Sequence, residues 1–291
     1  MENQTVLEFK NVTKKYGEKT VLSNFSARLT PGIYGLLGPN GAGKSTLMNL
    51  LTDNIKRTSG EILYNNEEIL RLGAGFRAKI GYMPQQQGMY EHFSGERFLY
   101  YVASLKGVKR REAGHQIEKY LNLVGLKKDS GRKLGGYSGG MRQRLMFVAA
   151  MLGEPEILIL DEPTAGLDPE ERIKIRNYVS ELSGERIVIL ATHVVSDIEC
   201  IASEILLLRQ GELIAKDAPH VLIQSVEDKI YERTCRHEEL KELMQAYPKG
   251  NVLQAARGLC YRIVQDECPD GFRRAEGAPN LEDVYLYWFK K

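Results

Sequence analysis

The stretch GPNGAGKST, residues 38–46, constrains the fold of this chain more than any other part of the sequence. It follows the apolar run Ile33–Leu37 and fits the pattern G-x-x-x-x-G-K-[ST], in which glycine-rich backbone wraps a chain of phosphates. A helix starting near Gly43 would aim its N-terminal N–H groups and its dipole at the anion. The sequence therefore predicts a nucleotide site formed by Gly38, Pro39, Asn40, Gly41, Ala42, Gly43, Lys44, Ser45 and Thr46.

The acid pair Asp161-Glu162 supplies the partner that a phosphate loop needs. Four apolar residues, Ile157–Leu160, precede the pair and predict a central strand with both carboxylates at its C-terminal end. Because strand side chains alternate in direction, we expect Asp161 to orient Mg²⁺ with the Ser45 hydroxyl, and Glu162 to polarise an attacking water. An Asp-Glu pair alone also suits the first turn of a helix. Its combination with Lys44, expected to contact the β- and γ-phosphates, favours the catalytic interpretation.

Strands and helices alternate along the rest of the first 220 residues. From about Phe93 to Gly153 the pattern turns helical, with glycines as breaks. This order predicts an α/β sheet with a helical insertion. Strands are expected at 7–10, 21–29, 33–37, 60–64, 79–83, 157–160, 187–191, 205–208 and 213–215, the last two flanking Gly211 as a hairpin.

The character of the chain changes after Pro219. A helix is expected over His237–Ala246, and a strand over Leu259–Val264. A terminal helix is expected over Leu281–Phe289, with Asn280 as its cap. These elements predict a small accessory domain of mixed α and β structure.

The composition is that of a soluble globular protein, with 43% hydrophobic and 27% charged residues. The formal net charge of +2 gives no reason to expect a nucleic-acid partner. The longest apolar run, Leu145–Leu152, is far shorter than a membrane span, and the start of the chain lacks a signal-peptide pattern. The four cysteines form no C-x-x-C pair, so we expect them reduced and buried in a cytoplasmic protein.

Residues 5 to 220 resemble the nucleotide-binding subunit of an ATP-binding cassette (ABC) transporter, because further motifs of that family accompany the phosphate loop and the acid pair in order. They are Tyr16, where the family has an aromatic that stacks on adenine; Gln85, the glutamine that senses Mg²⁺ and the membrane partner; the signature YSGGM at 137–141; the loop AGLD at 165–168; and His193, the switch histidine.

The resemblance implies a P-loop NTPase fold of the ABC type, with an antiparallel β subdomain and a helical subdomain over about residues 93–153. That ATPase domain is expected over residues 1–220, and the C-terminal α+β accessory domain over residues 221–291. The resemblance also implies that the chain binds and hydrolyses ATP with Mg²⁺. Tyr16 would then stack on adenine, Gln85 would join Ser45 and Asp161 at the metal, and His193 would contact the γ-phosphate.

The signature implies that one subunit alone does not form a complete ATP site. Ser138, Gly139 and Gly140 open a second helix N-terminus. In the family this N-terminus meets the γ-phosphate held by the opposite subunit, so we expect a head-to-tail dimer with a second copy or a homologous subunit. An integral membrane permease is the other expected partner, which would hold this chain on the cytoplasmic face of the membrane. Residues 86–93, with Tyr90 and Phe93, are the expected docking segment.

The family more often has leucine and glutamine where this chain has Tyr137 and Met141. The signature YSGGM, followed by Arg-Gln-Arg, and the late run Leu281–Tyr285 are similar to the drug- and antibiotic-exporter branch. A cassette ATPase without a transport role, such as an iron–sulfur assembly ATPase, stays open as an alternative from the sequence.

Overall fold

The computed structural model describes residues 5–85, 88–255 and 258–289 of the chain. It forms two compact units, Met1–Lys216 and Asp217–Lys291, and each has a hydrophobic core of its own. Gln86 and Gln87, the first residues of the expected docking segment, lie outside the described residues. In the described part of the chain, no helix is long and apolar enough to cross a membrane.

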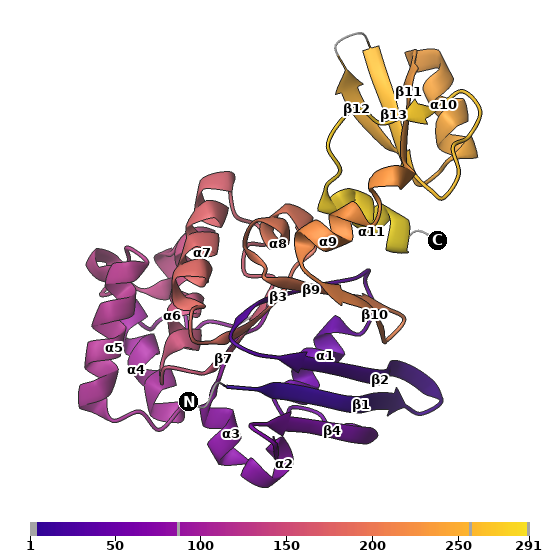
Figure 1. Cartoon of the computed structure of the whole chain (residues 1–291). Coiled ribbons are helices and arrows are strands. Elements are labelled where there is room, and N and C mark those ends of the chain that lie inside the picture. The colour runs from indigo at the N-terminus through magenta and orange to yellow at the C-terminus, as the bar shows by residue number, and fades with distance from the viewer. Residues whose placement is uncertain (1–4, 86–87, 256–257, 290–291) are drawn as a thin grey trace. The chain divides into compact units, whose positions relative to one another are not determined.

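A six-stranded sheet in the order β10-β9-β3-β8-β7-β6 is the centre of the first unit (Figure 1). β9, β3, β8, β7 and β6 pair with their neighbours in parallel. β3, β7 and β8 are buried along almost their whole length, as expected for parallel strands covered on both faces. The strands are β3 (Gly32–Leu37), β6 (Ile80–Met83), β7 (Ile157–Asp161), β8 (Ile187–Ala191), β9 (Glu204–Arg209) and β10 (Glu212–Asp217).

The second sheet of this unit is the expected antiparallel one, in the order β2-β1-β4-β5. Its strands are β1 (Leu7–Tyr16), β2 (Lys19–Leu29), β4 (Ser59–Tyr64) and β5 (Glu67–Glu68). The predicted strand at residues 7–10 was too short. β1 continues to Tyr16, since its pairing with β2 is interrupted by a register shift between Phe9 and Val12 and then resumes. Asn11, inside this shift, has a positive φ of 49°. A bulge of this kind breaks the alternation on which the prediction relied.

Helices α4 (Gly95–Leu105), α5 (Arg110–Leu123) and α6 (Gly139–Met151) form the predicted helical insertion, here called the helical lobe. Figure 1 shows these helices grouped to one side of the sheets. Helix α1 (Lys44–Leu51) instead packs Leu47, Met48, Leu50 and Leu51 into one core cluster with residues of both sheets. The other helices of the unit are α2 (Ile69–Leu72), α3 (Ala74–Ala78), α7 (Pro169–Leu182) and α8 (Val195–Ile201), with 3₁₀ turns η1 (Lys127–Asp129) and η2 (Leu134–Gly136).

The second unit contains a four-stranded sheet in the order β12-β13-β11-β14. Asn280 caps α11 as predicted, since its side-chain oxygen accepts a bond of 3.1 Å from the Asp283 N–H. Arg262 and Asp283 form a buried ion pair of 2.6 Å that ties α11 to β13. The elements are α9 (Pro219–Gln224), η3 (Glu227–Lys229), β11 (Ile230–Cys235), α10 (His237–Ala246), β12 (Asn251–Ala255), β13 (Gly258–Val264), β14 (Arg273–Arg274) and α11 (Leu281–Phe289).

All four cysteines are free thiols. Cys235 and Cys260 are buried, as expected, but the prediction was wrong for Cys200 and Cys268, which are exposed. The exposure of these two side chains is set by tertiary packing, which the spacing of cysteines does not reveal.

Candidate functional site

The phosphate loop joins β3 to α1, and its glycines are set by close packing. A Cβ atom on Gly38 would lie 2.3 Å from the Leu208 carbonyl oxygen. Gly43, the N-cap of α1, has a φ of +107°, and a Cβ there would lie 2.9 Å from the Val21 carbonyl oxygen. Gly41 also has a positive φ, +81°, but a Cβ there would meet nothing within 4 Å. The loop is therefore fixed by packing at Gly38 and Gly43 and open at Gly41, where a ligand can approach the backbone.

Helix α1 turns its N-terminus to this loop. The N–H groups of its first turn, from Lys44, Ser45 and Thr46, have no carbonyl within the helix to pair with. The Lys44 ammonium donates hydrogen bonds to the Gly38 carbonyl and, at 3.1 Å, to the Pro39 carbonyl. Backbone donors and one cation are thus gathered around a single loop, a donor set that suits a polyphosphate.

The acid pair lies at the C-terminal end of β7, but strand alternation does not explain its geometry. β7 ends at Asp161, and Glu162 has a left-handed backbone with a φ of +52°. The Glu162 N–H donates to the Ala191 carbonyl at 2.8 Å, which holds this turn against β8. A left-handed non-glycine residue costs free energy and is retained where the surroundings hold it in place.

The Glu162 carboxylate, only 8% exposed, is held by two residues that follow β8. The Thr192 hydroxyl donates to Oε2 at 3.2 Å, and the His193 backbone N–H donates to Oε1 at 3.0 Å. His193 Nδ1 lies 2.8 Å from Glu162 Oε2. The predicted residues Glu162 and His193 are therefore in direct contact, and the orientation of the carboxylate is fixed from two sides.

Sequence reasoning missed Thr192 and a second set of buried polar residues next to the acid pair. The Thr164 hydroxyl donates to Asp197 at 2.7 Å, and Arg176 pairs with Asp197 at 3.2 Å. These bonds tie the loop after Glu162 to α7 and α8. The only sequence signal for Thr192 is its place between a buried strand and His193.

Lys44, Asp161 and Glu162 lie within electrostatic reach of one another. The pKa of Asp161 is raised to about 6: burial has the largest effect, the charge of Glu162 adds to it, and the Lys44 ammonium acts in the opposite direction. Burial lowers the pKa of Lys44, while the charges of Glu162 and Asp161 act in the opposite direction. Two carboxylates and one ammonium thus share a half-buried space. A cation or a phosphate bound there would shift the pKa of Asp161 and of Lys44.

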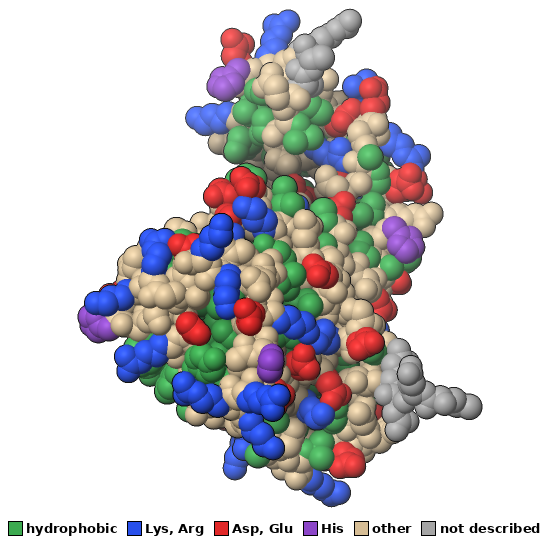
Figure 2. Space-filling view, turned by 90° about the vertical axis from the view of Figure 1, so that its left-hand side faces the viewer, with side chains coloured by type: hydrophobic (Ala, Val, Ile, Leu, Met, Phe, Trp, Pro, Cys, Tyr) green, Lys and Arg blue, Asp and Glu red, His purple; other side chains and the backbone are tan. Residues whose placement is uncertain are grey.

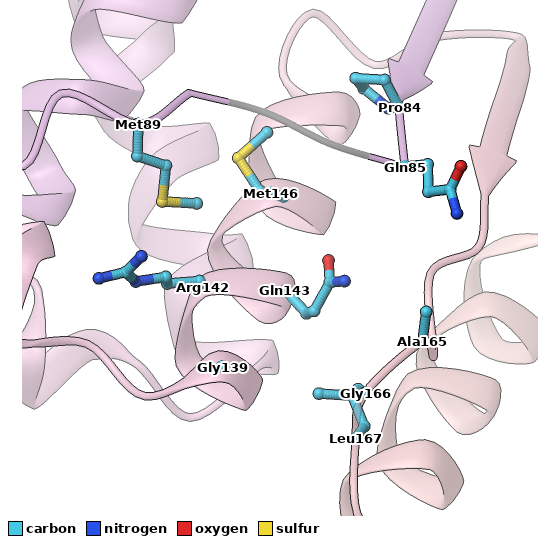
Figure 3. Close-up of a pocket in the computed structure, with 10 residues that line it drawn as sticks. All are labelled: Pro84, Gln85, Met89, Gly139, Arg142, Gln143, Met146, Ala165, Gly166 and Leu167. Atoms are coloured by element: carbon cyan, nitrogen blue, oxygen red, sulfur yellow. The ribbon is translucent and has the colours of Figure 1, made fainter.

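The signature opens α6 as predicted. Ser138 is the N-cap, and its hydroxyl accepts a bond of 3.2 Å from the Met141 N–H. Gly139 and Gln85 line a cavity of about 430 Å³ together with residues 165–167 of the loop after the acid pair (Figure 3). Among the described residues that line this cavity, none belongs to the phosphate loop. Among the described residues, Gly139 thus shares this cavity with the loop after the acid pair and not with the phosphate loop.

Tyr16 ends β1 with 51% of its surface exposed. The Lys14 ammonium lies 4.7 Å from the centre of its ring. One ring face is thus covered by a cation in this structure, and a large part of the residue is accessible to a planar partner.

The charges of the acid pair give a direct prediction. Replacing Lys44 by methionine removes a positive charge near Asp161, so the pKa of Asp161 should rise above its value of about 6. Glu162→Gln removes a negative charge, so the same pKa should fall. Carbon-13 NMR of the Asp161 carboxyl group in the nucleotide-free protein measures both shifts, with the distant Glu154→Gln variant as the control. A pKa that moves in neither variant would show that the three groups are not coupled.

Comparisons with known proteins show the family of this chain. The family model described as "ABC transporter" matches residues 22–165. The Nod factor export ATP-binding protein I of Burkholderia orbicola is 30% identical over 96% of this chain and 95% of its own length. The bacitracin transport ATP-binding protein BcrA of Enterococcus faecalis is 38% identical over 72% of this chain and 68% of its own length.

A solved structure shares the fold as well. The dimeric structure of a bacterial ABC transporter cassette aligns with a TM-score of 0.65 and 26% identity, over 73% of this chain and 98% of that one. The near-complete coverage of the Nod factor export relative carries the assignment beyond the phosphate loop alone. The chain belongs to the family of ABC transporter ATP-binding proteins.

Proposed function

We propose that this chain hydrolyses ATP in the presence of Mg²⁺ and uses the cycle to power export through separate integral membrane subunits. The contact of the buried Glu162 carboxylate with Thr192 and His193 is the observation that carries the proposal. The printed names of the relatives, Nod factor export and bacitracin transport, support export of a cargo. Residues 1–220 are proposed as the ATPase domain and residues 221–291 as an accessory domain.

The residues take distinct roles in this reaction. Lys44 and the N–H groups of α1 bind the phosphates, and Tyr16 stacks on the base. Ser45, Gln85 and Asp161 would hold Mg²⁺, which supplies positive charge to the phosphate oxygens. Glu162 accepts a proton from the attacking water, and His193 contacts the γ-phosphate. A carboxylate held by two donors is suited to this task because it does not have to reorient when the water arrives.

A second copy of the chain is proposed to complete each site in a head-to-tail dimer. Gly139 lines the cavity in Figure 3 with Gln85 and the loop after the acid pair, and none of the described residues that line it belongs to the phosphate loop, which supports a signature that acts on the nucleotide of another chain. The similar solved cassette is dimeric. These two observations support a site whose phosphate loop and signature come from different subunits.

Charge supports the same arrangement. Residues 95–151 of the helical lobe contain twelve Lys or Arg against four Asp or Glu, whereas residues 152–216 contain six against thirteen. Figure 2 looks onto the side of the molecule where the helical lobe lies, and Lys and Arg side chains are numerous there. Opposite charges on the two segments would attract when the helical lobe of one subunit faces the acidic segment of the other.

Glu162→Gln tests the proposed chemistry. The amide keeps the shape of the side chain but cannot accept the proton of the attacking water, so hydrolysis should fall by at least about 100-fold. ATP binding should persist, and the unhydrolysed nucleotide should hold a dimer that gel filtration detects. Glu154→Gln, which changes an exposed carboxylate elsewhere, is the control. Hydrolysis at the wild-type rate by Glu162→Gln would rule out this residue as the base.

The membrane subunit is proposed to dock on an aromatic cluster at the start of the helical lobe. Tyr90 stacks on Phe93 with ring centres 5.0 Å apart, Tyr101 meets Tyr90 edge-on, and the Arg97 guanidinium lies 4.2 Å from the Phe93 ring centre. Tyr90 is 51% exposed and Tyr101 is 39% exposed. Exposed aromatics that follow Gln85 in the sequence are suited to receive a short helix of the permease, since such side chains often dominate binding energy.

Tyr90→Ala and Phe93→Ala should each weaken binding of the permease by about tenfold, because each removes an aromatic anchor. Co-purification with the membrane subunit and permease-stimulated ATPase activity measure the effect, while nucleotide binding by the isolated chain should not change. Leu70→Ala removes a comparably exposed apolar side chain of α2 and serves as the control. Normal coupling of both aromatic variants would place the docking site elsewhere.

A further inference from the structure

The two glycines of the signature have different surroundings. A Cβ atom on Gly139 would meet nothing within 4 Å. A Cβ on Gly140 would lie 2.9 Å from Glu171 Oε2 and 3.2 Å from both Cδ and Cγ of the same side chain. The absence of a side chain at Gly140 is thus explained by a neighbour within the chain, whereas at Gly139 nothing in the described chain explains it.

Glu171 is itself held from several sides. Its backbone N–H donates to Asp168 Oδ1 at 2.9 Å, in the N-terminal cap of α7. Its Oε1 accepts from the Lys174 ammonium at 3.0 Å, and its Oε2 lies 3.4 Å from Nε of Arg144, on α6. The side chains of Arg144 and Glu171 are only 15% and 17% exposed, so solvent screens this ion pair little. The Lys174 bond holds one oxygen of the carboxylate, while the other oxygen, next to Gly140, lies near Arg144 without a hydrogen bond to any described residue. The carboxylate occupies the space between α7 and the first turn of α6.

We propose that Glu171 is a positioning residue for the signature helix. Its carboxylate fills the space beside Gly140 and pairs with Arg144, so it sets the distance from α7 to the N-terminus of α6. The inference rests on the proposed function, in which that N-terminus binds the nucleotide of the partner subunit. Glycine is needed at position 140 because Glu171 occupies the space of a side chain there. The surface of Gly139 stays open for the partner's nucleotide.

The assignment makes a specific prediction for paired variants. Gly140→Ala forces Glu171 and the first turn of α6 apart, and should lower kcat by about tenfold, in the range of coupling between residues in contact. Glu171→Ala removes Cγ, Cδ and both oxygens, and should also lower kcat because α6 loses its spacer. Adding Gly140→Ala to Glu171→Ala should then cause no further loss, since the clash is gone.

Gly139→Ala is the matched control. Its Cβ does not approach Glu171, so its effect on kcat should be the same with and without Glu171→Ala. Glu171→Gln keeps the shape of the side chain but removes its charge. It should retain most of the kcat, which would show that the space filled by the side chain matters more than its charge. Nucleotide binding by the isolated subunit should be unchanged in all these variants, whereas the ATP concentration required for dimerisation should rise in Gly140→Ala.

Thermal unfolding gives a readout that does not depend on ATPase activity. Gly140→Ala should lower Tm in the wild-type background and leave it unchanged in the Glu171→Ala background. An equal loss of Tm and kcat in both backgrounds would overturn the role of Glu171, even if the proposed ATPase function stands. Coupling in Tm without any coupling in kcat or dimerisation would limit Glu171 to stabilising the fold and would also overturn the proposal. Failure of the proposed function itself would appear separately, as an inactive wild type or an active Glu162→Gln variant.

Discussion

The structure depends on backbone N–H groups at helix N-termini that have no partner in their own helix. Helix α1 presents such a turn beside the phosphate loop, and α6 presents another beside the signature. Donors of this kind are useful only if the backbone itself is accessible to the anion, which side chains would prevent. Gly38 and Gly43 lie where a Cβ would collide with the Leu208 and Val21 carbonyl oxygens. Packing therefore holds the loop in the form that exposes its donors.

The charges around the loop are balanced against burial. Asp161 has a raised pKa because it is partly buried and because the charge of Glu162 lies near it. Lys44 has a lowered pKa because it is partly buried. Each group is thus less fully charged than it would be in water, and in the proposed function the phosphates and Mg²⁺ supply the missing partners. The same unbalanced charges then favour both the binding of the nucleotide and the reaction. Thr192 and the His193 N–H fix the Glu162 carboxylate.

Local patterns were enough to predict the elements that carry their own signals. The buried strands β7 and β8, the cap of α11 by Asn280 and the helix opened by Ser138 all follow from short-range chemistry. Other features arise from contacts between distant segments and have no local signal. The strand β11 has Glu232 and Arg233 in its middle, and Glu232 is buried where Cys260 of β13 and Arg273 of β14 contact its carboxylate. The approach of Glu171 to Gly140 joins two helices that are separate in sequence, so spacing cannot reveal it.

In the proposed dimer, one chain supplies the phosphate loop of each nucleotide site and the other chain supplies its signature. Mixing two inactive variants, Ser138→Arg and Lys44→Ala, tests it most directly. A mixed dimer has one site with an intact Lys44 from the first variant and an intact Ser138 from the second. ATPase activity should appear on mixing, while each variant alone stays inactive. If every mixture is as inactive as its components although mixed dimers form, the phosphate loop and the signature do not come together from different subunits.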